Sequence, residues 1–172
     1  MVIYQRGRQR VLAWMMLIGN HGRNKMEVSM EDDTIKLLRE CNAGIKMGIS
    51  SLEDAMDKVE NSRLYGLLQE SKDTHCRLGN ATHRYLREYH DEGKEPAPMA
   101  KMMSKVKTDM KVLSDRVDAG IADLITDGCN MGTKSLYRYL NQYPAAEEKV
   151  KELTREIISV EEKLIEDLRA YL

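Results

Sequence analysis

The chain has 172 residues, of which 32% are charged and only 5% aromatic. This length fits a single domain with a sizeable core. The net charge of −1 is unevenly spread, because residues 1–25 hold five basic and no acidic residues. The acidic remainder argues against a nucleic-acid partner. The three cysteines are an odd number and lie far apart, which favours reduced thiols in a cytoplasmic protein over a disulfide framework.

Residues 1–29 are predicted to form a basic extension outside the fold, and residues 30–172 to form one domain. The apolar run at 11–18 is about eight residues long, at the lower limit for a signal peptide, and no small-x-small cleavage site follows it. It is also far too short to span a bilayer. We favour an extension, or an upstream start codon, and keep membrane-surface attachment as the disfavoured alternative.

Two helices are predicted before residue 91, over residues 31–58 and 62–90. Apolar residues recur in both at a spacing of three or four, which is typical of an amphipathic helix. Because the turn at Glu60 and Asn61 is very short, the two helices should form an antiparallel hairpin. Gly44 and Gly48 lie one turn apart, and we interpret them as a place of close helix packing.

A second hairpin is predicted after residue 116. Its first helix covers residues 117–141 and ends before Pro144. Its second helix should start at Ala145, with Glu147 and Glu148 in the first turn, where the helix dipole favours acidic residues. Apolar stripes again indicate that each helix buries one face.

The link between the hairpins, residues 91–118, determines the topology. Pro96 and Pro98 end the preceding helix, and the methionine-rich residues 99–113 repeat at helical spacing. A short crossover helix of this kind lets the chain run back along the bundle. We therefore predict an all-α, up-down-down-up four-helix bundle. We interpret the methionines as packing residues rather than soft-metal ligands.

Two long hairpins joined by a crossover helix resemble the ferritin-like superfamily, and most closely its small uncharacterised bacterial four-helix-bundle families. Members of those families carry Gly-Glu-Asp about ten residues into the third long helix, where this chain has Gly128-Cys129-Asn130. The resemblance covers roughly residues 30–172. It implies two metal ions, held by Glu on the first and third helices and by Glu-x-x-His on the second and fourth.

This sequence departs from that metal-binding pattern. Lys72 stands where Glu would precede His75, and Leu164 stands where His would follow Glu161. We therefore expect no cofactor, with His75, Glu161 and Cys129 as weak metal candidates. The alternative is a metal-binding or redox protein that holds iron or another transition metal with non-standard ligands. No catalytic motif is visible, so we lean toward a protein that is not an enzyme.

The leading functional hypothesis is protein association, either with a partner or with a second copy. Tyrosine combines apolar area with a polar tip and is enriched at interfaces. If the second and third long helices are parallel, four tyrosines collect at one end of the bundle as a candidate contact surface. These residues are Tyr85, Tyr89, Tyr137 and Tyr139.

The turns of the two hairpins also predict which residues share a height. They place His75 opposite Glu161 in the middle of the bundle, level with Gly44 or Ile45. Cys41 and Cys129 should then lie within about one turn, roughly 5 Å, of this layer. A buried carboxylate needs a partner, so we predict a His75–Glu161 contact in place of a metal centre.

Overall fold

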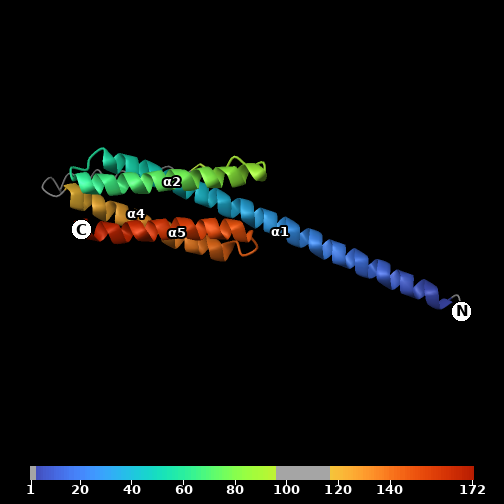
Figure 1. Cartoon of the computed structure of the whole chain (residues 1–172). Helices are drawn as coiled ribbons and strands as arrows, with labels where there is room; N and C mark the ends of the chain where they lie inside the picture. The colour runs from blue at the N-terminus through green and yellow to red at the C-terminus, as the bar shows by residue number, and fades with distance from the viewer. Residues whose placement is uncertain (1–2, 96–116) are drawn as a thin grey trace.

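The computed structural model describes the backbone of residues 3–95 and 117–172, and the side chains of 26–95 and 117–172. Within these residues the fold is an all-α four-helix bundle (Figure 1). Its long helices are α1 (Ile3–Met56), α2 (Ser62–Glu88), α4 (Val117–Gln142) and α5 (Glu148–Leu168), and a 3-10 turn, η1 (Arg169–Tyr171), follows α5. The crossover helix predicted for 99–113 lies outside the described residues.

The first helix starts far earlier than predicted. We expected a start at Glu31, but α1 begins at Ile3 and its N-terminal half extends beyond the rest of the bundle (Figure 1). Acidic residues at 31–33 suggested a first turn, yet residues 3–30 contain no proline that would stop a helix there. The division between an extension at 1–29 and a bundle at 30–172 stays a prediction.

The predicted short turn joins α1 and α2. The side chain of Asn61 accepts hydrogen bonds from the backbone N–H groups of Arg63 and Leu64, which caps the start of α2. The backbone N–H of Glu60 donates to the Asp118 side chain at 2.9 Å. The turn of the first hairpin is therefore held by a residue at the start of the second.

After α2 the chain folds back over α1 through residues 91–95. Gly93 has a φ of +87°, and a Cβ there would lie only 2.5 Å from Nδ2 of Asn42, so only glycine fits. The carboxylate of Asp91 accepts hydrogen bonds from two nitrogens of the Arg39 guanidinium group and from the N–H of Gly93. The Lys94 carbonyl accepts from Asn42.

The second hairpin differs from the prediction at its turn. The last long helix begins at Glu148 rather than Ala145, because Pro144 and the residues after it form a turn. Two side chains of α1 bind this turn: Asp33 accepts from the N–H of Ala145, and Thr34 accepts from the N–H of Glu147. The acidic residue at 33 thus caps a turn of the other hairpin instead of its own helix.

The helix directions follow from two groups of core residues. One group joins the end of α1, the start of α2, the start of α4 and the end of α5, through residues such as Met56, Leu64, Ile121 and Leu168. The other joins the opposite ends, where tyrosines pack against Leu37, Leu86, Leu136 and Val150. We call these the Leu64 end and the tyrosine end. Accordingly, α2 and α4 run in the same direction, and α1 and α5 run the opposite way (Figure 1).

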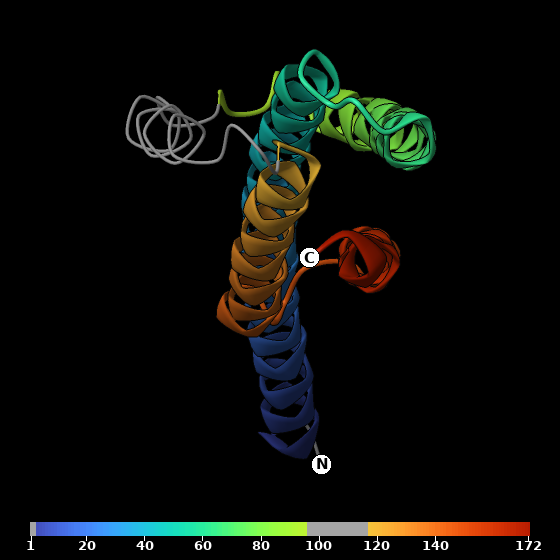
Figure 2. The same cartoon turned by 90° about the vertical axis from the view of Figure 1, so that its left-hand side faces the viewer.

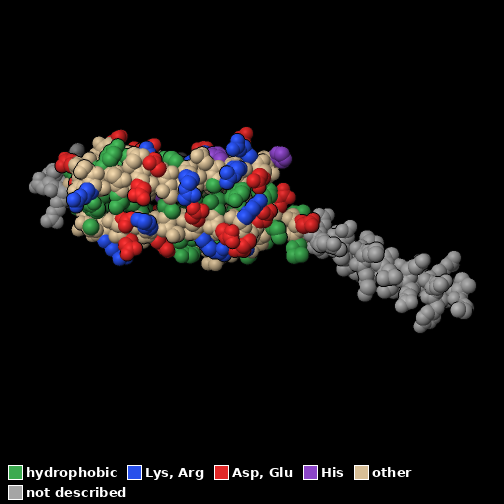
Figure 3. Space-filling view, in the orientation of Figure 1, with side chains coloured by type: hydrophobic (Ala, Val, Ile, Leu, Met, Phe, Trp, Pro, Cys, Tyr) green, Lys and Arg blue, Asp and Glu red, His purple; other side chains and the backbone are tan. Residues whose placement is uncertain are grey.

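Each helix has two main neighbours. Helix α1 packs on α2 and α4, and α5 packs on the same two helices from the opposite corner. Figure 2 looks along the bundle and shows the C-terminal end of α1 beside α2, with α4 and α5 below them and the N-terminal part of α1 emerging beyond α4. Positive and negative side chains are mixed over the face shown in Figure 3. No helix in the described part of the chain is long and apolar enough to cross a membrane.

Candidate functional site

A histidine and a glutamate meet in the middle of the bundle, as the sequence predicted. Nε2 of His75 lies 3.2 Å from Oε1 of Glu161, which joins α2 to α5. The imidazole is fully buried, and 12% of the Glu161 side chain is exposed. The pair lies between the Leu64 end and the tyrosine end, with Leu68 and Leu78 of α2 packed in those two clusters.

Both nitrogens of His75 face hydrogen-bond acceptors. Nδ1 lies 2.8 Å from the Ser71 carbonyl oxygen, and Nε2 faces the Glu161 carboxylate. A neutral imidazole has only one N–H, whereas the charged form has two, so this geometry favours an imidazolium. Burial by itself lowers the pKa of His75. The hydrogen bond to Glu161 and the charge of that carboxylate raise the pKa by more than burial lowers it, so the net shift is upward.

Space for the imidazole depends on Gly48 of α1. A Cβ at this position would lie 3.2 Å from Cδ2 and 3.4 Å from Nε2 of His75, which is tighter than ordinary packing. The sequence placed Gly44 or Ile45 at this height, one turn too early. The turn itself spans residues 57–61, between Met56 and Ser62, so the discrepancy does not come from the position of the turn along the chain.

The thiol of Cys129 also reaches this layer. Burial raises the pKa of Cys129, and the charge and hydrogen bond of Glu161 raise it further. The thiol therefore stays protonated and acts as a weak donor to the carboxylate. His75, Glu161 and Cys129, predicted as weak metal candidates, come from three different helices and meet at one carboxylate.

The predicted position of Cys41 is wrong. Its sulfur lies 3.3 Å from Oγ1 of Thr154, within the core cluster of the tyrosine end. Seven residues separate Cys41 from Gly48, which corresponds to roughly 10 Å along α1. Because the His75 layer lies a turn further along α1 than expected, Cys41 forms a separate polar layer with Thr154.

A cavity of about 350 Å³ adjoins the His75 layer between α1 and α4. Two Gly-x-x-x-Gly pairs, at 44 and 48 and at 128 and 132, are the features of the sequence that lie along this cavity. Our interpretation of the first pair as close packing is wrong for Gly44, since a Cβ there would meet no described atom within 4 Å. Small residues line much of this cavity, namely Ala43, Gly44, Gly48, Ser51, Ala55, Gly128, Gly132 and Ser135.

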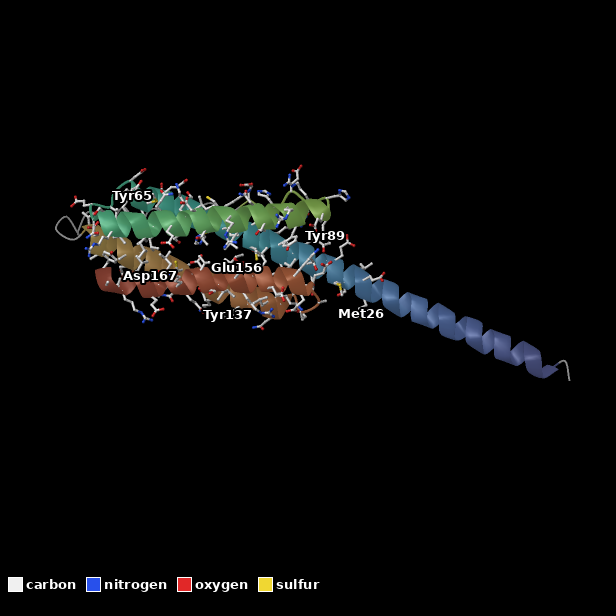
Figure 4. The ribbon with its side chains drawn as sticks, viewed as in Figure 1. Met26, Tyr65, Tyr89, Tyr137, Glu156 and Asp167 are labelled. Carbon is white, nitrogen blue, oxygen red and sulfur yellow. The ribbon has the colours of Figure 1, made fainter. Side chains whose placement is uncertain are left out.

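The four predicted tyrosines all lie toward the tyrosine end, with unequal exposure. Tyr85, Tyr89 and Tyr139 are partly buried against the core of the same chain. The Tyr89 hydroxyl donates to Glu147, and Lys149 lies over the rings of Tyr85 and Tyr89. Tyr137 is the most exposed of the four, at 49%. Figure 4 labels Tyr89 and Tyr137 on α2 and α4.

The donors in the middle layer fit a di-metal centre poorly. Such a centre in a ferritin-like bundle uses four carboxylates and two histidines, whereas this layer offers one carboxylate, one imidazole already bound to it, and one protonated thiol. Metal binding requires a thiolate and a neutral imidazole. Across residues 26–95 and 117–172, no three His, Cys, Asp or Glu side chains are grouped so that they could hold a metal ion.

Comparison with known proteins gives no relatives: no protein-family model, curated protein or solved structure matches the chain.

Proposed function

We propose that this chain is a ferritin-like bundle that acts by protein association, chiefly with a second copy of itself, and that the His75–Glu161 contact replaces a metal centre. The order of helix directions supports the ferritin-like part of the proposal, with parallel α2 and α4 at opposite corners. The position of the polar layer also supports it, because His75 and Glu161 occupy one position each of the two Glu-x-x-His motifs that the resemblance implies.

One observation carries the association proposal: α1 continues as a helix past the tyrosine end of the bundle (Figure 1). An isolated helix in water is only marginally stable and usually depends on packing against another element. Where α1 leaves the bundle, Met26, Val28 and Met30 have exposures of 62%, 62% and 41%. Tyr137 adds exposed aromatic area at the same end. A second copy would cover these side chains.

The mass of the protein in solution tests this proposal. We expect an oligomer by size-exclusion chromatography with light scattering, and a shift toward the monomer for Tyr137→Ala, Tyr139→Ala and Met26→Glu. The matched control is Tyr65→Ala, since Tyr65 is 45% exposed but lies at the Leu64 end (Figure 4). A wild-type protein that stays monomeric at all concentrations, or equal effects at both ends, would contradict self-association through the tyrosine end.

The alternative is a metal-binding or redox protein with non-standard ligands. The contact between His75 and Glu161 is the observation in its favour, because an imidazole and a carboxylate are both metal ligands. Metal content by mass spectrometry, after purification without a metal-affinity tag, separates the two functions. Stoichiometric iron, manganese or zinc that is lost in Glu161→Gln would establish the alternative.

A further inference from the structure

Two glycines at helical positions line the cavity between α1 and α4, Gly44 being exposed and Gly128 partly buried. A Cβ on Gly44 or on Gly128 would meet no described atom within 4 Å. Glycine is unfavourable in the interior of a helix, and neither position has a positive φ that would require it. Among the described residues, these two positions thus leave space beside the two helices at a cost in helix stability.

The size and the walls of the cavity suit a small apolar molecule. Its volume of about 350 Å³ lies at the lower end of the range of about 300–1,000 Å³ found for small-molecule sites. The lining residues run along α1 from Glu40 to Ala55, which corresponds to roughly 23 Å, so the space is elongated. The walls are mainly aliphatic and include Ile45, Leu52, Ile125, Leu136, Ile157 and Leu164.

One polar group in this apolar lining has hydrogen-bonding capacity to spare. The carboxylate of Glu161 lines the cavity, and a carboxylate accepts about four hydrogen bonds. His75 supplies one donor. A largely buried carboxylate gains from further donors, so a ligand in this space is favoured if it carries an N–H or O–H group.

The charges around the cavity favour a neutral ligand. The charged residues along its lining are balanced, with Glu40 and Asp54 against Lys58 and Lys94. Glu161 is already paired with His75, so an additional ammonium would leave a net positive charge in the cavity. A carboxylate ligand would instead approach Glu161 with the same sign of charge. A hydroxyl group supplies the donor without either penalty.

From this chemistry we infer that the α1–α4 cavity is a binding site for a long-chain aliphatic alcohol, whose hydroxyl donates to Glu161 and whose chain lies along the aliphatic walls. This inference is independent of self-association, because the cavity lies between helices of one chain.

Binding of 1-decanol to the full chain tests the inference. By isothermal titration calorimetry we expect saturable binding of about one molecule per chain, with methyl decyl ether and sodium decanoate at least tenfold weaker. The ether has the same chain but no donor, and decanoate carries the repelled charge. The same concentrations of decanol should raise the melting temperature, because a ligand that binds only the folded state stabilises it.

Variants at the glycines show where the alcohol binds. Gly128→Leu and Gly44→Leu would fill the cavity and are expected to weaken decanol binding at least tenfold. Gly66→Leu is the matched control, because a Cβ on Gly66 also meets no described atom within 4 Å, but Gly66 lies on α2 away from the cavity. Circular dichroism would show that all three variants stay helical.

Three results would overturn the inference. The first is no saturable binding of decanol to the wild type, as expected if another part of a protein fills the space. The second is equal binding of decanol and the ether, which would remove Glu161 from recognition. The third is unchanged binding in both cavity variants, which would place the alcohol elsewhere.

Discussion

Two polar layers cross the bundle about 10 Å apart, and they hold their buried groups in different ways. In the first, Thr154 donates locally to the carbonyl of Val150 in its own helix, and Cys41 of α1 contacts the same hydroxyl, so both groups are neutral. Burial raises the pKa of Cys41 to about 12, which keeps its thiol protonated. In the second, an imidazolium and a carboxylate from different helices satisfy each other beside a cavity.

The difference shows that local hydrogen bonds can satisfy a buried neutral group, whereas a buried charge requires a partner from across the bundle. Loss of one member should therefore matter far more in the His75 layer than in the Cys41 layer. The four predictions below test this contrast, beginning with the largest expected effect.

Glu161→Ala should cost about 3 kcal/mol in the free energy of unfolding, because it leaves the buried imidazole of His75 without its partner. Urea denaturation at pH 6, where the imidazolium is favoured, measures this cost. His75→Leu combined with Glu161→Leu should recover much of it, since apolar groups of similar size need no partner. If the single variant were as stable as the wild type, the pair would not be an ion pair in the folded state.

A rise in pH should weaken the His75 layer less than truncation does, because a neutral imidazole still donates one hydrogen bond. The pKa of His75 is raised in the folded state. Its stabilising contribution is therefore complete below the unfolded pKa of about 6.5 and is lost as the pH rises through the folded pKa. NMR titration of His75 checks this. An unshifted or lowered pKa that does not change in Glu161→Gln would contradict the pairing.

Thr154→Val should cost about 1 kcal/mol, because it removes one neutral hydrogen bond at nearly constant shape. The thiol of Cys41 loses only a weak contact. The same urea experiment at pH 6 gives a direct comparison with Glu161→Ala. A cost as large as that of the charged layer would remove the proposed distinction between the two layers.

Two glycine substitutions should have the smallest effects. They compare a position whose Cβ would meet open space with a position whose Cβ would meet the His75 ring. Gly44→Ala should stabilise the protein by roughly 0.5–1 kcal/mol through better helix propensity, since its Cβ has open space. Gly48→Ala should lose that gain, because its Cβ would lie 3.2 Å from His75. Thermal melts of both variants measure the difference. If Gly44→Ala and Gly48→Ala stabilised the protein equally, the His75 ring would have to move away from the new Cβ at no cost in free energy.

The sequence allowed the His75–Glu161 contact to be predicted because two short turns fix helix heights. Once Glu60 and Asn61 close one hairpin and Pro144 ends a helix in the other, residues a known number of turns away face each other. Such counting assumes that the two helices are level at the turn, and a stagger of one helical turn between them changes which residues face each other. That stagger explains why Gly48 was missed as the neighbour of His75, and why Cys41 was placed in the wrong layer.

The cavity and the start of α1 could not be predicted from the periodicity of apolar residues. Apolar periodicity identifies which face of a helix is buried, but not how closely two buried faces approach. Gly44 therefore looked the same in sequence whether it allowed close packing or left space. The start of α1 was misplaced because Asp33 resembles a first-turn acidic residue, whereas its carboxylate binds the N–H of Ala145 in another part of the chain.

The side chains that hold the two hairpin turns have a consequence for cooperativity. Asp118 of the second hairpin binds the turn of the first, and Asp33 and Thr34 of the first bind the turn of the second. Each hairpin turn is satisfied only in part by its own hairpin, so separation of the two halves would leave the N–H groups of Glu60, Ala145 and Glu147 without these partners. Unfolding should therefore be all-or-none, and a chain cut between the halves would regain its structure only when both fragments are present together.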